Sequence, residues 1–180
     1  MGNIVDDIRA NEDTFAGRPF NEVDSLALAQ LSYARMPVNV PRLDAEATDV
    51  DLAMVGVRDL LRAECYDDMF GKVWSPSMNV DLLRAMCESP RWRDLRVGGY
   101  VDEFDPETTK QFSACVFDVG DGSSYVAFRG TDSTIVGWKE DFAMAFRRPV
   151  AAQESAARYL ADIAGRRDGP LMVGGHSKGG

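Results

Sequence analysis

Apolar residues in the first half of the chain recur at the spacing of helices. We predict amphipathic helices over residues 21–36, 48–61 and about 79–89, each with one apolar face. Pro37 and Pro90 follow the first and the third of these patterns. Because proline lacks the N–H group that a helix interior needs, both residues mark helix ends.

The spacing of apolar residues changes from the helical period to alternation near Arg96. We predict strands over residues 97–104, 111–118 and 124–129. The sequence Gly120-Asp121-Gly122 separates the last two, and glycine readily adopts the left-handed backbone that tight hairpin turns require. An antiparallel or mixed sheet is therefore expected to begin here.

The last part of the chain returns to a mixture of helix and strand. The type of the segment 138–146 stays open. A helix is expected over about 150–164, and Asp168-Gly169-Pro170 then forms a turn into a short apolar strand, 171–174. A strand, a helix and a strand in this order form the basic unit of α/β proteins. The helix is expected to bury Ala156, Ala157, Leu160 and Ile163.

The length and composition fit one globular domain. The chain has 180 residues, of which 45% are hydrophobic, and we find no repeat, low-complexity tract or linker in it. We therefore predict a single α/β domain over 1–180, with a helical region over 1–95 and the sheet over 96–180.

The charge balance is acidic, with 20 basic and 29 acidic residues and a net charge of −9. The acidic groups are scattered and there is no block of lysine or arginine. This argues against nucleic acid or an anionic membrane surface as the main partner. We interpret the small basic cluster of Arg91, Arg93 and Arg96 as a solvated turn.

The cysteine and histidine content argues against disulfides and metal binding. Cys65, Cys87 and Cys115 are unevenly spaced, which is typical of reduced thiols in an intracellular protein. His176 is the only histidine and has no neighbouring cluster of ligands. The N-terminus does not resemble a signal peptide, and no apolar run is long enough to span a bilayer. We expect a cytoplasmic protein without metal or cofactor.

The apolar run 171–174 leads directly into Gly175-His176-Ser177-Lys178-Gly179. This matches the G-x-S-x-G nucleophile elbow, where a serine stands at the reversal from a strand to a helix. The serine adopts a sparsely populated backbone conformation, and the chain fits only if the residues two before and two after it lack a Cβ. An elbow would expose the Ser177 hydroxyl and point the Lys178 N–H at an oxyanion. The alternative is a glycine-rich loop without a chemical role.

A polar turn follows the strand 124–129 and is the second candidate for chemistry. In acyl transfer one oxyanion donor follows the nucleophile, and the other comes from a loop at the end of an adjacent strand. Thr131 suits this second role, because its N–H can point into the site while its hydroxyl fixes the loop. The alternative is that the polar residues 131–134 only stabilise their own turn.

These motifs together resemble a known family. Phe128-Arg129-Gly130-Thr131, followed by Ile135, Trp138 and Asp141 and then by the elbow, resembles the class 3 (fungal-type) lipase branch of the α/β hydrolases. In that branch an Arg-Gly-Ser or Arg-Gly-Thr turn supplies the oxyanion residue, and a leucine usually stands where this chain has Lys178. The whole chain more closely resembles a bacterial family of lipase-like serine hydrolases. That likeness rests on Phe-Asn-Glu-Val-Asp at 20–24, Glu-Ser-Pro-Arg at 88–91, the run 126–142 and Gly-Gly-His-Ser-Lys-Gly-Gly at 174–180.

The resemblance implies an α/β-hydrolase fold and a role for each matching residue. Ser177 would be the nucleophile, and the N–H groups of Thr131 and Lys178 would form the oxyanion hole. We give the Lys178 amine no catalytic role, because adjacent residues on a helix point about 100° apart. Asp141 would accept hydrogen bonds from the oxyanion turn, and the further supports would be Gly130, Trp138, Gly175, His176 and Gly179.

Hydrolases of this fold place the acid and the histidine of the triad after the serine, so both are expected beyond Gly180. The chain is then the N-terminal part of the fold, and we expect it to be almost inactive alone. A C-terminal remainder or a second polypeptide would complete the sheet beside the strand 171–174.

We therefore predict part of a serine hydrolase that cleaves small-molecule or lipid-like carboxylic esters. An inactive hydrolase-like binding module is the main alternative, and a peptidase or thioesterase is another. The apolar residues between 131 and 150 fit a lid over the site or core packing, and we prefer core packing.

Overall fold

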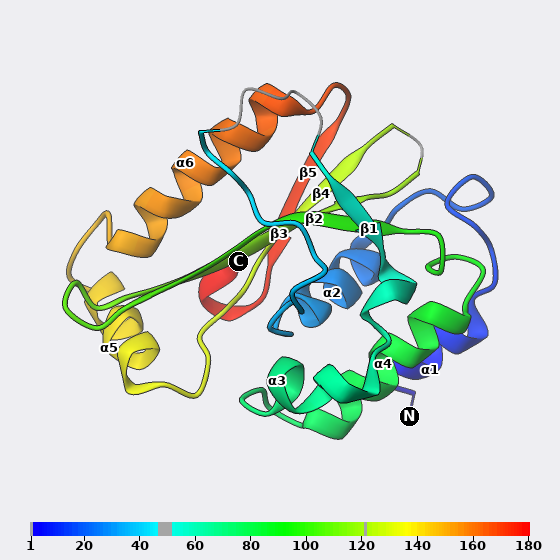
Figure 1. Cartoon of the computed structure of the whole chain (residues 1–180), viewed down its shortest axis with the longest axis horizontal. Coiled ribbons are helices and arrows are strands. Elements are labelled where there is room, and N and C mark those ends of the chain that lie inside the picture. The colour runs from blue at the N-terminus through cyan, green and yellow to red at the C-terminus, as the bar shows by residue number, and fades with distance from the viewer. Residues whose placement is uncertain (1, 47–51, 121) are drawn as a thin grey trace.

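The computed structural model describes residues 2–46, 52–120 and 122–180 (Figure 1). The helices are α1 (Ile4–Ala10), α2 (Glu22–Leu31), α3 (Tyr66–Phe70), α4 (Pro76–Glu88), α5 (Ile135–Met144) and α6 (Ala151–Arg166). The strands are β1 (Met54–Gly56), β2 (Arg96–Asp105), β3 (Lys110–Asp118), β4 (Ser124–Phe128) and β5 (Leu171–Gly175). Short 3-10 turns are η1 (Val57–Leu60), η2 (Ala63–Cys65) and η3 (Ser177–Gly179).

The strands form one mixed sheet in the order β1-β2-β3-β4-β5. Neighbours from β1 to β4 pair antiparallel, whereas β4 and β5 run parallel. Parallel neighbours need a crossover connection, which α5 and α6 supply. The α/β class and the mixed sheet are confirmed. Gly120 and Gly122 of the expected hairpin turn have φ angles of 88° and 85°, and Asp121 lies outside the described residues.

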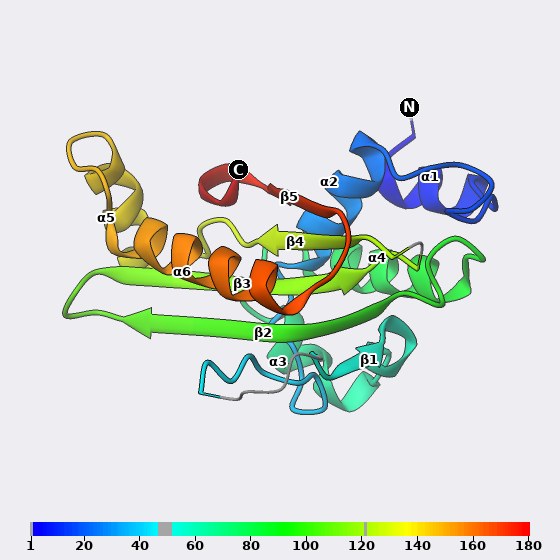
Figure 2. The same ribbon diagram turned by 90° about the horizontal axis from the view of Figure 1, so that it is seen from above.

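Helices cover both faces of the sheet (Figure 2). On one face, α6 packs through Ile163 against a cluster that includes Ala114 and Val116 of β3. On the other face, α2 and α4 pack on a larger cluster that includes Cys115 and Phe117 of the same strand. Successive side chains of a strand point to opposite faces, so β3 serves both cores by alternation.

The first and third predicted N-terminal helices are confirmed as α2 and α4, but α2 ends at Leu31 rather than at residue 36. Asn21 caps α2, because its side chain accepts hydrogen bonds from the N–H groups of Val23 and Asp24. α4 begins at Pro76, earlier than the predicted start at Asn79, because proline is compatible with the first turn of a helix. The Asn79 side chain is buried and donates to carbonyl oxygens that precede the helix.

The helix predicted over 48–61 is wrong where the structure describes it. Its first positions, including the expected cap Thr48, lie outside the described residues. Met54–Gly56 instead forms β1 against β2, and the chain continues as the 3-10 turn η1. Val57 and Leu60 of η1 are both fully buried. A spacing of three residues satisfies a 3-10 turn as well as an α-helix, so the apolar pattern did not separate the two. The described residues of the region 1–95 accordingly form helices and turns together with β1.

The segment 138–146 belongs mostly to a helix, α5. The helix predicted over 150–164 is confirmed as α6, but its buried face is turned. Ile163 is buried as predicted, whereas Ala157 is exposed and Ala156 and Leu160 are only partly buried. Tyr159 takes the central position, because its hydroxyl donates a 2.8 Å hydrogen bond to the Gly99 carbonyl oxygen of β2. The residues of α6 buried with it are Ala152, Ser155 and Ile163.

The expected solvated turn at Arg91 is also wrong. Arg91 is 3% exposed and its guanidinium forms two hydrogen bonds, of 2.9 and 2.5 Å, with the carboxylate of Asp24 in α2. Further donors of the guanidinium reach the carbonyl oxygens of Asp13, Arg18 and Pro19. A buried charge needs such partners. The ion pair joins the two N-terminal stretches, 20–24 and 88–91, that carry the family resemblance.

Candidate functional site

Ser177 stands at the point where β5 turns into η3. Its φ angle is 58°, in the left-handed region that non-glycine residues rarely adopt, and the residue is exposed. Such a conformation costs on the order of 1–3 kcal/mol and persists only where the surrounding structure enforces it. The sparsely populated backbone conformation predicted for this serine is therefore confirmed, and the 3-10 turn η3 follows it.

Gly175 and Gly179 leave no room for a side chain, as predicted. A Cβ on Gly175 would collide with the Gly179 carbonyl oxygen and lie 2.7 Å from that of Phe128. A Cβ on Gly179 would collide with the Phe128 carbonyl oxygen and lie 2.8 Å from the carbonyl carbon. Any side chain at either position would thus force β4 and the elbow apart.

The turn after β4 lies directly beside this elbow. β4 and β5 are parallel neighbours with Phe128 opposite Gly175, so both chains leave the sheet at the same edge. A Cβ on Gly130 would lie 3.1 Å from the Cβ of Ser177 and would collide with the His176 carbonyl oxygen. The structure therefore brings together the two motifs that are 46 residues apart in the sequence, counting from Thr131 to Ser177.

Thr131 is buried, and its hydroxyl donates a 2.5 Å hydrogen bond to Oδ2 of Asp141 in α5. The expected contact from the turn to Asp141 is thus present. Residues of the turn also bond among themselves, since the N–H and hydroxyl of Thr134 both donate to Asp132 Oδ1. Thr131 thus bonds outward to α5, whereas Thr134 and Asp132 stabilise the turn itself. Trp138, the other expected support, is 49% exposed on the outer side of α5.

His176 packs beside the elbow, as expected, against a residue that the sequence did not single out. The Tyr33 hydroxyl lies 2.9 Å from His176 Nδ1, and the two rings meet edge to face at 5.7 Å. Tyr33 follows α2, and a Cβ on Gly130 would collide with its hydroxyl oxygen. Burial raises the pKa of Tyr33, a shift that Arg129 opposes and Asp141 reinforces. Tyr33 therefore touches both motifs of the site.

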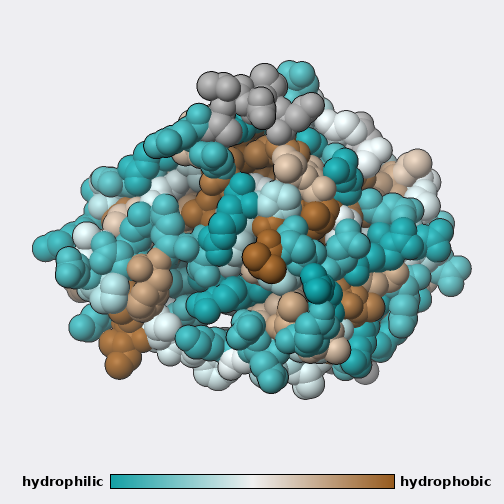
Figure 3. Space-filling model, viewed as in Figure 1, coloured by the Kyte–Doolittle hydropathy of each residue, from teal (hydrophilic) through white to brown (hydrophobic). Residues whose placement is uncertain are grey.

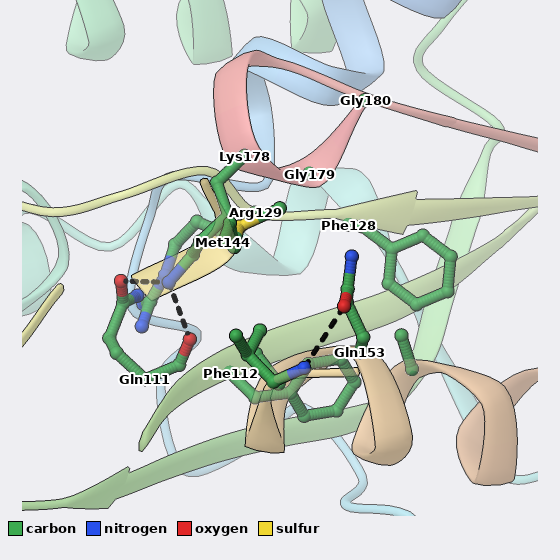
Figure 4. A pocket seen from close by; sticks show the side chains of 12 residues that line it. Gln111, Phe112, Phe128, Arg129, Met144, Gln153, Lys178, Gly179 and Gly180 are labelled. Atoms are coloured by element: carbon green, nitrogen blue, oxygen red, sulfur yellow. Dashed lines mark hydrogen bonds between the residues drawn. The ribbon is translucent and has the colours of Figure 1, made fainter. Parts of the chain in front are cut away.

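The Lys178 amine is buried, and Figure 4 shows its two hydrogen bonds to Gln111. Lys178 Nζ donates to Gln111 O at 2.8 Å, to Gln111 Oε1 at 3.0 Å and to Glu140 Oε2 at 2.9 Å. The side chains of Lys178 and Glu140 are 6% and 2% exposed. Lysine has three donors, and all three are used. The amine accordingly fixes the elbow to β3 and α5.

Glu140 is the centre of this network, and the sequence did not single it out. Besides the amine, its carboxylate accepts hydrogen bonds from the N–H of Gln111 at 3.0 Å and of Ala152 at 2.9 Å. Ala152 lies in the first turn of α6, where unpaired N–H groups favour a negative charge. In the sequence Glu140 and Asp141 are adjacent acids, and that pattern does not reveal that both point inward.

A cavity of about 220 Å³ adjoins the backbone of the elbow (Figure 4). Lys178, Gly179 and Gly180 form one wall. The other walls are largely apolar and include Phe112, Phe128, Met144, Val150 and Ala156.

Several absences hold for the part of the chain that the structure describes. No group of three or more histidine, cysteine, aspartate or glutamate side chains is arranged to hold a metal ion. Within residues 2–46, 52–120 and 122–180, no helix is long and apolar enough to cross a bilayer. The Ser177 hydroxyl forms no hydrogen bond with any described residue, and Nδ1 of His176 is paired with the Tyr33 hydroxyl.

The second half of the chain matches a known protein family. A family model described as Mbeg1-like matches residues 86–180, which is more than half of the 180 residues. This match covers β2 to β5, the turn at Thr131 and the elbow. No curated protein and no solved structure matches the chain.

Proposed function

The chain belongs to the Mbeg1-like family, and from this premise we propose that it is the nucleophile-bearing part of a serine hydrolase with the α/β-hydrolase fold. The reaction is the cleavage of carboxylic esters, with small-molecule or lipid-like esters as substrates. The observation that carries the proposal is the exposed Ser177 at a positive φ angle beside the Gly130–Thr131 turn.

In this proposal Ser177 Oγ attacks the acyl carbon of the ester, and the carbonyl oxygen becomes an oxyanion. Two N–H groups are suited to stabilise it. The Thr131 N–H donates no hydrogen bond to any described residue. The Lys178 N–H comes just before the N–H of Gly179, which donates the first backbone hydrogen bond of η3 to the His176 carbonyl oxygen. Preorganised donors of this kind are each worth about 2.7–4 kcal/mol of transition-state stabilisation.

The surrounding residues support these donors without touching the reacting atoms. Asp141 holds the Thr131 hydroxyl, and the network of Lys178, Gln111 and Glu140 holds the turn after the nucleophile. The parallel pair β4 and β5, with both candidate motifs at its carboxyl end, agrees with the site position of α/β folds.

A serine needs a base to attack an ester at neutral pH. In the proposed fold the acid and the histidine of the triad follow the serine in sequence. We propose that residues after Gly180, or a second polypeptide beside β5, supply them.

The test is labelling with a fluorophosphonate, which reacts with activated serines. The protein is prepared with any residues that its gene encodes after Gly180, as wild type, Ser177→Ala and the buried-serine control Ser89→Ala. We expect wild type and Ser89→Ala to be labelled and Ser177→Ala to remain unlabelled. A folded wild-type protein that stays unlabelled both alone and in a lysate of its source cells, where any second polypeptide is present, would overturn the proposal.

That outcome would favour the second candidate, an inactive hydrolase-like binding module. Both candidates agree with a Ser177 hydroxyl that forms no hydrogen bond with any described residue, so the labelling decides between them. A folded, unlabelled protein that still binds a non-hydrolysable ester analogue would establish it.

A further inference from the structure

The outer face of α5 carries an unusual set of exposed apolar side chains. Ile135, Trp138, Phe142 and Phe146 are 74%, 49%, 70% and 88% exposed. They are spaced three and four residues apart, so the three within α5 form one stripe, which the helical turn after Met144 extends to Phe146. Figure 3 shows apolar side chains gathered at the lower left of the molecule, over α5. The preference for core packing of these residues is therefore wrong.

The exposed charged side chains on α5 and just after it are positive. Lys139, Arg147 and Arg148 are exposed and form no ion pair with any described residue. The two acids of α5, Glu140 and Asp141, point inward and are bound to Lys178 and to Thr131. The exposed charged side chains of α5 and of the residues that follow it, 145–149, are thus all cations, although the protein has a net charge of −9 and the neighbouring turn exposes Glu107.

A groove of about 280 Å³ runs along α5 beside these cations. Lys139, Arg147 and the adjacent residues Thr108 and Thr109 line it, together with the already bonded Glu140. Thr108 and Thr109 belong to the turn between β2 and β3. The Thr108 hydroxyl already donates to Asp105 Oδ2 at 2.7 Å, so the donors left for phosphate oxygens are the Lys139 ammonium and the Arg147 guanidinium.

We infer that the α5 face is a docking surface for a phospholipid membrane that contains anionic lipids. The stripe of Ile135, Trp138, Phe142 and Phe146 enters the boundary between headgroups and acyl chains, while Lys139, Arg147 and Arg148 contact headgroup phosphates. Large apolar residues flanked by cations on a helix are the features of interfacial helices. The net charge opposes binding only weakly at contact, because charges beyond about 8 Å are screened at physiological ionic strength.

This surface does not depend on Ser177 being a nucleophile. The inward side of α5 is held by two independent contacts, to Lys178 and to Thr131, so the outward stripe keeps a fixed orientation. A docked membrane would therefore lie beside the candidate site rather than over the opposite end of the sheet, where β1 is located.

The experiment measures partitioning into vesicles of phosphatidylcholine alone and of phosphatidylcholine with phosphatidylglycerol. Trp74 is replaced by phenylalanine, so that Trp138 is the only exposed tryptophan and buried Trp92 contributes a constant signal. We expect a blue shift of Trp138 emission and tighter binding to the anionic vesicles. In Trp74→Phe/Ser177→Ala the shift and the affinity are unchanged.

Paired variants test the two parts of the surface. Phe142→Ser/Phe146→Ser is expected to weaken binding at least tenfold, whereas Val38→Ser, at a residue 99% exposed elsewhere, has no effect. Lys139→Glu/Arg147→Glu is expected to abolish the preference for anionic vesicles, with a loss of about fivefold for each cation removed. Arg9→Glu, an exposed cation on α1, is the matched control.

Two outcomes would overturn the inference. One is equal binding of wild type and Phe142→Ser/Phe146→Ser, or no binding of either. The other is self-association of the wild type, seen by sedimentation, that Phe142→Ser/Phe146→Ser removes while vesicles have no effect. The α5 face would then cover a second copy of the chain.

Discussion

Lys178 Nζ lies 2.9 Å from Glu140 Oε2, and this contact ties the residue after the candidate nucleophile to the helix that carries Asp141. A buried ion pair of this kind adds little net stability, but removing one partner leaves an uncompensated charge. The pair therefore acts mainly by fixing where the elbow lies.

Glu140→Gln is expected to lower the free energy of unfolding by about 3 kcal/mol, because the buried ammonium loses its counter-charge. Glu140→Gln/Lys178→Met is expected to recover much of that loss. Urea denaturation of the single and double variants measures the coupling. Asp94→Asn breaks the exposed Arg58–Asp94 pair as a control and is expected to cost less than about 1 kcal/mol. Equal losses in Glu140→Gln and Asp94→Asn would contradict the assigned role.

Gly179→Ala is expected to destabilise the protein by roughly 1–3 kcal/mol, because the new Cβ collides with the Phe128 carbonyl group. It should also reduce fluorophosphonate labelling of Ser177. Gly165→Ala in α6 is the matched control, since no atom lies within 4 Å of the added Cβ. This control is expected to raise stability by about 0.5–1 kcal/mol. Thermal unfolding of both variants measures the contrast, and a tolerated Gly179→Ala would show that the elbow is loosely packed.

Thr131→Val removes the hydroxyl that binds Asp141 but keeps the size of the side chain. Because Asp141 Oδ1 is already buried without a partner among the described residues, the variant leaves the carboxylate unsatisfied. We expect a loss of about 1–3 kcal/mol in unfolding free energy. Thr131→Ser keeps the hydroxyl and should lose clearly less. Chemical denaturation distinguishes the two, and identical losses would mean that the methyl group alone matters.

Stability should fall at alkaline pH through the buried thiol of Cys115. Burial raises its pKa from 9.0 to about 12, so between these values the unfolded chain loses a proton that the folded protein keeps. The contribution to stability is complete below pH 9 and declines by about 1.4 kcal/mol per pH unit above it. Urea denaturation from pH 8 to 10.5 should therefore give a shallower decline for Cys115→Ala. The half-buried Cys65 provides the control variant Cys65→Ala, and an unchanged slope in Cys115→Ala would refute the assignment.

Much of the sheet and of the elbow was predictable because the relevant signals are local. The alternation in β3 and the glycines around Ser177 depend on neighbouring residues and on backbone sterics. The side-by-side position of the Thr131 turn and the elbow followed from two strands that end at one edge.

The parts that were missed depend on contacts between distant residues. The inward orientation of Glu140 is decided by Lys178 and by the start of α6, and the burial of Arg91 is decided by Asp24. In the same way, the sequence left the type of the segment 138–146 open, and it did not show whether another element covers Ile135, Trp138 and Phe142.

The contact between Tyr33 and His176 limits how far the protein can be shortened from its N-terminus. The family match begins at residue 86, yet Tyr33 and Asp24 lie well before that position. A fragment cut at this boundary would strip the imidazole of its hydroxyl partner and leave the Arg91 guanidinium without its counter-ion. The smallest autonomous unit is therefore larger than the recognisable homology, and deletion studies should retain α2.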